Sequence, residues 1–319
     1  MTIDEAPAPR PLPLLGTYAM APGDPAEEAE LYAAVRDLPI AGLEAPLLPE
    51  DHGLLSPAWR ERNLDPAWDL LVTCIPTVMH RLGDGDRYGL ASTDHAAREA
   101  ALADVARARD LARTLAEEQG RPVVTGIQVH SAPGPGRGSL DSLRRSLTTL
   151  AGWDLAGARL LLEHCDARVE GQDAAKGFLT LDEEIATLEA LGPDARIGLS
   201  INWGRSAIEG RSAQTPVDHA RAARDARLLG ALVLSGAADT ETAWGPAWSD
   251  AHIPPRGPHP ALARSSGSLL DVEQVRRTLV AAGPVPVAVK VAVRPSTATV
   301  DERVAVARAS LALLEDARG

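Results

Sequence analysis

The sequence predicts an α/β protein built as a single closed (β/α)8 barrel, and three observations support this prediction. Short apolar runs that end in small or polar residues alternate with longer stretches of helical period rich in Ala, Leu, Arg and Glu. The alternation repeats eight times in 319 residues, a length typical of such a TIM barrel. The first strand runs into TYAMAPGDP, which lacks the Gly-rich phosphate-binding turn of the rival fold, a doubly wound open sheet.

Strands and helices are expected to alternate along the whole chain. The strand candidates, which are short β-like apolar runs, cover residues 14–18, 39–44, 69–75, 123–130, 158–164, 196–202, 230–236 and 287–294. The helical stretches cover residues 24–37, 94–119, 139–151, 180–191, 216–228, 270–282 and 299–317. Between the second and third strands, residues 45–68 contain four prolines and leave room for only a short helix near 57–63.

Capping signals support three of these helices. The tripeptide STD at residues 92–94 precedes the longest one, and such side chains are typical of a helix N-cap. Thr180 lies three residues before Glu183, the spacing of a capping box. Thr299 and Glu302 repeat that spacing before the last helix.

The composition indicates a soluble cytoplasmic protein that binds neither nucleic acid nor membranes. Its 44 acidic and 32 basic residues give a formal net charge of −12, which opposes binding to a polyanion. Two cysteines, Cys74 and Cys165, are too few for a disulfide scaffold and suit a reducing compartment. No apolar run approaches the roughly 20 residues that span a bilayer. Residues 1–12 lack the features of a signal peptide and are expected to form a flexible Pro-rich tail before a barrel domain of residues 13–319.

Strand alternation places polar side chains inside the upper part of the barrel. In residues 287–294 the valines form one face, suited to packing beneath helices, which turns Lys290 into the barrel and Arg294 toward its carboxyl-terminal mouth. Lys290 is one of only two lysines in the chain. The same alternation in the other strands gives an inward polar set that consists of Glu44, Gln128, His130, Glu163, Ser200, Asn202, Ser235 and Lys290.

A polar interior of this kind predicts a ligand site. Unpaired polar groups in a closed interior cost roughly several kcal/mol each, and barrels of this class are usually filled with branched apolar residues. Active sites of the fold lie at the carboxyl-terminal ends of the strands, where the inward polar set gathers. The alternative is a polar network whose members satisfy one another and catalyse nothing.

Four short motifs carry a resemblance to a known family. They are GLEAP with Glu44, QVHSAPG with His130, LLLEHCD with Glu163 and SINWGR with Asn202. With these motifs, residues 14–317 resemble the xylose isomerase-like barrels, a superfamily of sugar isomerases, sugar epimerases and the second type of apurinic endonucleases, and within it a bacterial branch. The resemblance implies a carbohydrate-type ligand and, as the family default, a divalent Mn, Mg or Zn ion.

The departures from the family pattern argue against that metal. Metal-dependent epimerases of the family hold the ion with Glu, Asp, His and Glu on strands five to eight, and the corresponding positions here are Glu163, Asn202, Ser235 and Lys290. Only Glu163 is a strong ligand, because an ammonium group has no lone pair. We therefore expect no cofactor and no tightly bound metal, and we expect Lys290 to neutralise Glu163 in place of the ion.

Loops at the same end are expected to contribute to the site. Residues 131–138 lead into a helix amino terminus, where an anion could bind. Residues 236–268 are long enough for a lid, and the tryptophans within them suit stacking on a sugar ring. Residues 76–93 are expected to form a loop that brings His80, Arg81, Arg87 and Tyr88 above the barrel. The remaining rim candidates are Lys176, Trp203, Arg205, Glu209 and Arg211.

The leading functional hypothesis is an enzyme similar to sugar isomerases and epimerases, or a lyase, that transfers a proton next to a carbonyl group. Glu163 would act as base or acid, Lys290 would polarise the substrate oxygen, and His130 and Asn202 would hold hydroxyl groups. The expected substrate-binding residues are Glu44, Gln128, Ser235, Arg294, Arg205, Trp203, His80 and Lys176.

Two alternatives stay open. Lys290 could form a Schiff base, as in lysine-dependent aldolases, which requires an uncharged amine. The barrel could also bind a sugar without catalysis, and homo-oligomers are compatible with each hypothesis. A cysteine nucleophile is not expected, because His164 and Cys165 are neighbours on a strand and face opposite sides.

Overall fold

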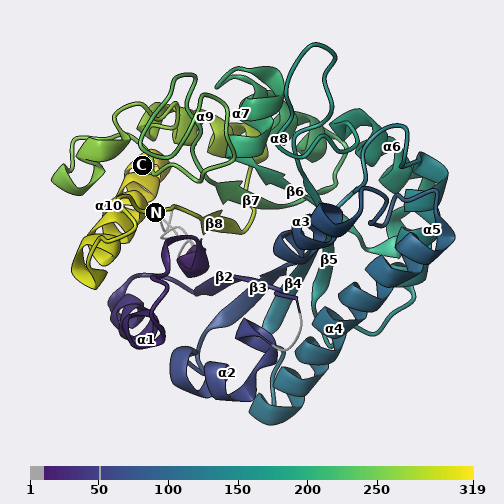
Figure 1. Ribbon diagram of the computed structural model, residues 1–319, viewed down its shortest axis with the longest axis horizontal. Coiled ribbons are helices and arrows are strands. Elements are labelled where there is room, and N and C mark those ends of the chain that lie inside the picture. Colours follow the sequence, from purple (N-terminus) through teal and green to yellow (C-terminus); the bar gives the residue numbers. More distant parts are fainter. Residues whose placement is uncertain (1–10, 50–51) are drawn as a thin grey trace, which may run out of the picture.

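Eight parallel strands close into a barrel in the computed structural model of the protein, which describes residues 11–49 and 52–319 (Figure 1). The strands follow one another around the ring in chain order, and the last pairs with the first. This confirms the (β/α)8 barrel. The strands are β1 (Leu14–Leu15), β2 (Gly42–Pro46), β3 (Asp69–Thr73), β4 (Val124–Val129), β5 (Arg159–His164), β6 (Gly198–Asn202), β7 (Leu229–Leu234) and β8 (Val287–Val289).

The helices surround the strand ring, and every helix expected from the sequence is present. They are α1 (Pro25–Ala34), α2 (Pro57–Asn63), α4 (His95–Gln119), α5 (Leu140–Ala151), α6 (Leu181–Leu191), α8 (Thr215–Asp225), α9 (Val272–Ala282) and α10 (Val300–Arg318). Short 3-10 helices occupy Thr17–Met20, Val35–Asp37, Gly53–Leu55, Pro193–Ala195 and Pro260–Ser265. None of the described helices is both long and apolar enough to cross a membrane. The first ten residues of the expected tail lie outside the described residues.

Two further helices begin directly at strand ends, where loops or rim segments were expected. Helix α3 (Ile75–Asp84) follows β3 after one residue, with a proline in its first turn, so residues 76–93 are not one loop. Helix α7 (Trp203–Gly210) follows β6 with no loop at all, because the side chain of Asn202 accepts a hydrogen bond from the Arg205 backbone and caps the helix.

Two apolar clusters distinguish the inside of the barrel wall from its outside. The inner cluster comes from strands on all sides of the ring, which meet in the middle, and consists of Leu14, Leu71, Leu161, Ala231, Val233 and Ala288. The outer cluster packs the wall against the helices and includes Val287, Val289, Val291 and Val293. The orientation expected for residues 287–294 is therefore confirmed, although the regular strand ends at Val289.

The segment between β7 and α9 is folded back over the barrel. Its Ile253 pairs with Gly236 through two backbone hydrogen bonds, and Trp244 donates its indole N–H to the Ala292 carbonyl at 3.0 Å. Trp244 is buried and Trp248 lies under the guanidinium of Arg211. Both tryptophans therefore contact protein, and the expectation that they stack on a sugar ring is not supported by their contacts.

A cavity of about 1150 Å³ lies at the amino-terminal end of the barrel and not at the polar end. Residues before or at the start of β5, β6 and β7 line it, among them Arg159. Arg159, Leu161 and Glu163 share one face of β5, with Leu161 in the inner apolar cluster. The apolar layer therefore separates this cavity from the polar interior.

Candidate active site

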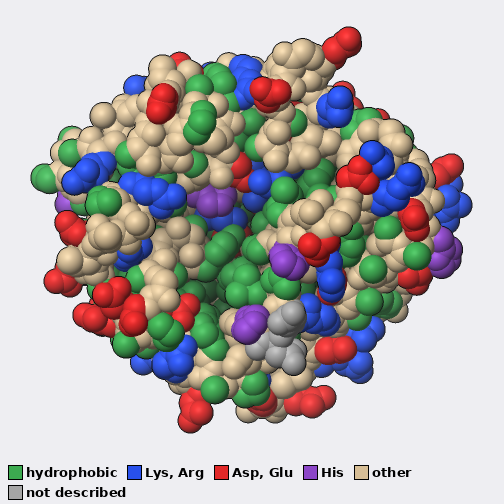
Figure 2. Space-filling view, in the orientation of Figure 1, with side chains coloured by type: hydrophobic (Ala, Val, Ile, Leu, Met, Phe, Trp, Pro, Cys, Tyr) green, Lys and Arg blue, Asp and Glu red, His purple; other side chains and the backbone are tan. Residues whose placement is uncertain are grey.

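All eight members of the inward polar set are buried, with exposed fractions of 1% or less. They lie on β2, β4, β5 and β6 or directly after the ends of β4, β7 and β8, beyond the inner apolar cluster at the carboxyl-terminal end of the ring. Figure 2 shows a central hollow in the face turned to the viewer, over the middle of the barrel, where hydrophobic side chains gather and histidine and basic side chains lie at the edge. The predicted location of the polar interior is thus confirmed.

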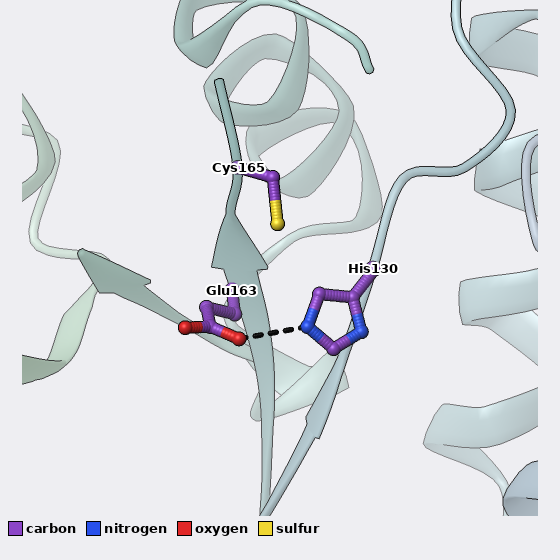
Figure 3. A group of neighbouring side chains, drawn as sticks. All are labelled: His130, Glu163 and Cys165. Atoms are coloured by element: carbon purple, nitrogen blue, oxygen red, sulfur yellow. Dashed lines mark hydrogen bonds and ion pairs between the residues drawn. The ribbon is translucent and has the colours of Figure 1, made fainter. Parts of the chain in front are cut away.

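Glu163 on β5 is the most highly bonded carboxylate of this interior. Its Oε1 lies 2.8 Å from Nη1 of Arg205 and accepts a hydrogen bond of 3.2 Å from the Asn202 amide. Its Oε2 lies 2.7 Å from Nε2 of His130, the contact drawn in Figure 3. Arg205 is 1% exposed and reaches under the mouth from the first turn of α7, so it is not the rim residue that the sequence suggested.

Lys290 pairs with Glu44, and this corrects the expectation that it pairs with Glu163. The Lys290 ammonium lies 3.0 Å from Glu44 Oε1. Strand β8 is separated from β2 by β1 alone, whereas β5 lies three strands away around the ring. At the end of β1, Gly16 leaves room for the pair: a Cβ there would lie 2.8 Å from Glu44 Oε2 and 3.0 Å from Lys290 Cβ.

Tyr18 is a residue of this site that the sequence reasoning missed. Its hydroxyl lies 3.5 Å from Glu44 Oε1, and the Lys290 ammonium lies 5.0 Å from the centre of its ring. Its position as the last residue of the expected first strand, residues 14–18, was the available signal, because the carboxyl-terminal ends of the strands border the mouth.

A third group of charges connects the interior to the segment after β7. Asp250 lies 3.2 Å from Arg205 Nε and 3.1 Å from the Lys176 ammonium. His252 Nδ1 lies 3.4 Å from Asp250 Oδ1 and 2.8 Å from the hydroxyl of Ser235. Lys176 and Ser235 therefore lie at the site as expected, whereas Asp250 was missed because nothing in its local sequence distinguishes it from a surface carboxylate.

The pKa values of the two interior glutamates are displaced in opposite directions. Burial raises the pKa of Glu44 above its ordinary 4.5, and Lys290 reverses this only in part. Burial acts in the same direction on Glu163, but Arg205, His130 and Lys290 together hold its pKa well below the ordinary value. Glu163 is therefore ionised, whereas protonation of Glu44 is favoured relative to an exposed glutamate.

Several buried polar atoms of the interior have no hydrogen-bond partner among the described residues. They include Glu44 Oε2, His130 Nδ1 and Gln128 Oε1, while the Gln128 amide donates to Ser200 at 2.9 Å. Burial lowers the pKa of His130, which favours its neutral form. Because Nε2 lies against the ionised Glu163, Nδ1 is the nitrogen left as an acceptor. Unpaired buried atoms of this kind are typical of a site that receives a polar ligand.

Four of the expected site residues lie elsewhere. Trp203 packs in the helical layer and donates its indole N–H to Thr278 on α9 at 3.1 Å. Arg81 and Tyr88 both bind Asp104 on α4, and thus hold α3 and the segment after it against that helix. His80 is exposed on α3, where its nearest ionic partner is its own helix neighbour Asp84 at 3.9 Å.

Arg294 is half-buried, and its guanidinium donates to the neighbouring Val293 carbonyl at 3.1 Å. Arg294 therefore lies at the end of this segment, and the contact does not connect it to Glu44 or Glu163.

The residues around Glu163 do not suit a divalent cation. At the positions where the resemblance places metal ligands, the amide of Asn202 donates to Glu163, Ser235 binds His252, and Lys290 binds Glu44. His130, Glu163 and Cys165 have ligand atoms within 4.8 Å of one another (Figure 3). However, Arg205 Nη1 contacts both Glu163 and the Cys165 sulfur, the latter at 3.4 Å. A guanidinium in this place repels a cation and uses the lone pairs that would bind it.

Comparison with known proteins places the chain in context. A family model described as "Domain of unknown function (DUF4862)" matches residues 14–306. The uncharacterized protein STM3670 of Salmonella typhimurium is 34% identical to the chain over 284 residues, which cover 85% of each protein.

Solved structures share the fold. A xylose isomerase-like TIM barrel protein from Mycobacterium smegmatis, in complex with magnesium, has a TM-score of 0.56 at 16% identity and covers 97% of this chain and 98% of its own. D-psicose 3-epimerase in the presence of D-fructose has a TM-score of 0.54 at 15% identity, with 89% and 91% covered. The fold is therefore that of the xylose isomerase-like TIM barrels, as the sequence motifs indicated.

Proposed function

The chain belongs to the DUF4862 family, and from this premise we propose that it is an enzyme that transfers a proton at the carbon next to a carbonyl group of a carbohydrate-derived substrate. The observation that carries the proposal is the pair of buried glutamates whose pKa values are displaced in opposite directions within one polar interior. Two carboxyl groups separated in this way are typical of sites that divide acid–base and electrostatic roles.

Glu44 exchanges the proton in this proposal. Its pKa is raised by burial, toward the range in which a carboxyl group both accepts and returns a proton near neutral pH, and its Oε2 has no partner among the described residues. The sequence assigned this role to Glu163, but the bonds from Arg205, His130 and Asn202 leave that carboxylate a weak base.

Lys290 stabilises the charge that develops on the substrate oxygen. The ammonium lies 3.0 Å from Glu44, so an oxygen bound beside it lies next to the carbon that Glu44 deprotonates. The same ion pair engages Lys290 with a carboxylate, which argues against the Schiff-base alternative because that reaction begins with a free amine.

Glu163 orients the groups that bind the rest of the substrate. As an ionised carboxylate it fixes the ring of His130 and leaves Nδ1 to accept a hydrogen bond from a hydroxyl group. The unpaired Gln128 Oε1 adds a second acceptor in the same interior. Acceptors of this kind suit a polyhydroxylated ligand, and the similarity in fold to D-psicose 3-epimerase is compatible with a sugar.

We also propose that this reaction proceeds without a metal ion in the barrel. The positive charges that face Glu44 and Glu163 belong to Lys290 and Arg205, which supply fixed electrostatic stabilisation at the places where a cation would otherwise be needed.

Proton exchange with solvent tests the proposal directly. The protein is incubated in D2O with a panel of aldoses, ketoses and 3-keto-glycosides, and deuterium uptake next to the carbonyl is followed by NMR. We expect uptake with at least one compound, and a rate lower by at least about 100-fold in Glu44→Gln and Lys290→Met, since each removes a group that acts in proton transfer. Arg221→Gln, at an exposed position on α8, is the matched control and keeps the wild-type rate. Circular dichroism verifies that the variants are folded.

Two results would contradict the proposal. Tight binding of one of these sugars without deuterium uptake would instead identify a non-catalytic sugar-binding protein. A borohydride-trapped adduct on Lys290, located by mass spectrometry, would instead identify an aldolase that uses a Schiff base.

A further inference from the structure

A second cluster of histidine and glutamate side chains lies outside the barrel wall. It is formed by His164 on β5, Glu184 on α6, Glu209 on α7 and His219 on α8. The imidazole of His164 lies between the two carboxylates, with Nδ1 2.8 Å from Glu184 and Nε2 3.0 Å from Glu209. Because strand neighbours face opposite sides, His164 points into the helical layer while Glu163 points into the barrel. The proposed reaction uses none of these four residues.

The two imidazoles of this outer cluster are oriented alike. Each has its Nδ1 within hydrogen-bond distance of an oxygen that can accept its proton, Glu184 for His164 at 2.8 Å and the hydroxyl of Ser206 for His219 at 3.0 Å. Each has its Nε2 directed to Glu209, at 3.0 Å from His164 and 3.8 Å from His219. In protein metal sites a ligating histidine commonly donates its other N–H to such an outer acceptor, which fixes the tautomer.

From this arrangement we propose that the outer cluster is a zinc site, with His164 Nε2, His219 Nε2 and the Glu209 carboxylate as ligands. These atoms all lie within 4.8 Å of one another and His164 Nε2 is already 3.0 Å from Glu209, so a shift of about 1 Å in the His219 side chain brings the set to the spacing of a tetrahedral ion with bonds near 2.0–2.2 Å. Zinc binds through the Nε2 lone pair of His164, and a proton on that nitrogen is released to solvent. Nitrogen and carboxylate oxygen ligands in a three-residue set are those of zinc, with water as the fourth ligand.

The charge of the outer cluster also favours a divalent cation. When zinc replaces the Nε2 proton of His164, both imidazoles are neutral and Glu184 and Glu209 give the cluster a formal charge of −2, which one Zn²⁺ neutralises. The backbone N–H of Ala167 donates to Glu209 at 2.8 Å and holds that carboxylate in place. The contrast with the barrel interior is clear, because there the guanidinium of Arg205 lies on Glu163.

The ion can reach the cluster from solvent. The side chains of Glu209 and His219 are 14% and 15% exposed, whereas that of His164 is fully buried. The open side of the cluster therefore lies at α7 and α8, and a bound ion would join these helices to the end of β5. The ion would lie outside the barrel wall, apart from the residues to which the proposed reaction is assigned.

Metal titration with matched variants tests this proposal. After treatment with EDTA, the wild-type protein is titrated with Zn²⁺ by calorimetry and with Co²⁺ by visible spectroscopy. We expect one ion per chain, with a tetrahedral Co²⁺ spectrum, and at least about 10-fold weaker binding in Glu184→Gln, where only the outer acceptor is changed. His219→Gln and Glu209→Gln lose a ligand and are expected to lose binding of stoichiometric zinc.

Two control variants distinguish zinc binding at the outer cluster from zinc binding at other histidines. His95→Gln removes an exposed imidazole and His130→Gln removes the one in the barrel interior, and both keep the wild-type affinity. The proposal is overturned if wild-type protein binds no zinc at micromolar concentration, or if His130→Gln loses the ion and His219→Gln keeps it. Should a ligand variant fail to fold, the Co²⁺ spectrum of the wild type decides, since an octahedral spectrum or none contradicts the site.

Discussion

At the scale of single residues, strand alternation predicts which side chains enter the barrel but not which of them pair. Lys290 was placed inside correctly, yet its partner is Glu44, because the distance around the ring decides the contact and a strand pattern contains no such distance. Arg205 was expected at the rim and instead binds Glu163, because α7 begins at once after β6. Pairings of this kind depend on the closed ring and cannot be inferred from one strand at a time.

The opposite displacement of the two glutamate pKa values is open to direct measurement. With ¹³C-labelled glutamate, NMR titration should show Glu44 protonating at a pH above 4.5 and Glu163 only below 4.5, because burial dominates at Glu44 and the cations dominate at Glu163. Glu44→Gln identifies the upper titration by removing it. Equal midpoints near 4.5 for both residues would contradict the proposed division of roles.

The same displacements fix the sign of two contributions to the free energy of unfolding. The pKa of Glu44 is higher in the folded than in the unfolded protein. Its stabilising contribution is therefore fully present below about pH 4.5 and is lost as the pH rises through the folded pKa. The pKa of Glu163 is lower in the folded than in the unfolded protein. Its stabilising contribution is therefore fully present above about pH 4.5 and is lost as the pH falls through the folded pKa.

At the scale of elements, helices with a capping signal were predicted best. The helices that begin after Thr180 and Thr299 start where the sequence placed them, and both capping boxes are formed. The missed helices α3 and α7 begin within one residue of a strand, so no loop residues separate strand from helix in the sequence and mark where the helix begins. The lengths of β1 and β8 were also overestimated, because the chain turns into a 3-10 helix at Thr17 and the regular strand of β8 ends at Val289.

The capping box of α6 should contribute measurably to stability. Thr180→Ala removes the hydroxyl that accepts the Glu183 backbone N–H at 3.3 Å and should lower the free energy of unfolding by about 1 kcal/mol in urea denaturation. Thr299→Ala should lower it by a similar amount at α10. Thr180→Ser keeps the acceptor and is the control, so equal stability of the Ala and Ser variants would argue that the cap is unimportant.

At the scale of the whole molecule, the eightfold alternation and the absence of a Gly-rich turn after the first strand together predict the barrel, and the closed ring of eight parallel strands confirms it. Closure requires close approach of neighbouring strands. At Gly42 on β2, a Cβ would lie 1.9 Å from the backbone oxygen of Asp69 on β3. No side chain can give way there, since the obstacle is the neighbouring strand itself.

Gly42→Ala should therefore destabilise the entire barrel. We expect a loss of about 3 kcal/mol or more in the free energy of unfolding, or failure to accumulate as soluble protein, because the ring has to open to admit the methyl group. Gly23→Ala is the matched control, since nothing lies within 4 Å of its added Cβ. Urea denaturation followed by circular dichroism compares the two, and similar midpoints would contradict the tight closure.

Glu163 and His164 are consecutive residues that serve opposite surfaces of one wall. A deletion or insertion of a single residue within β5 would exchange them, turning the imidazole toward Arg205 and the carboxylate toward Glu184. Only changes that keep Glu163 facing the barrel interior and His164 facing the helices are then tolerated. The barrel interior and the outer cluster therefore cannot change independently in evolution. Loops of the same chain carry no such restriction, and variation in length among relatives should accumulate there and spare β5.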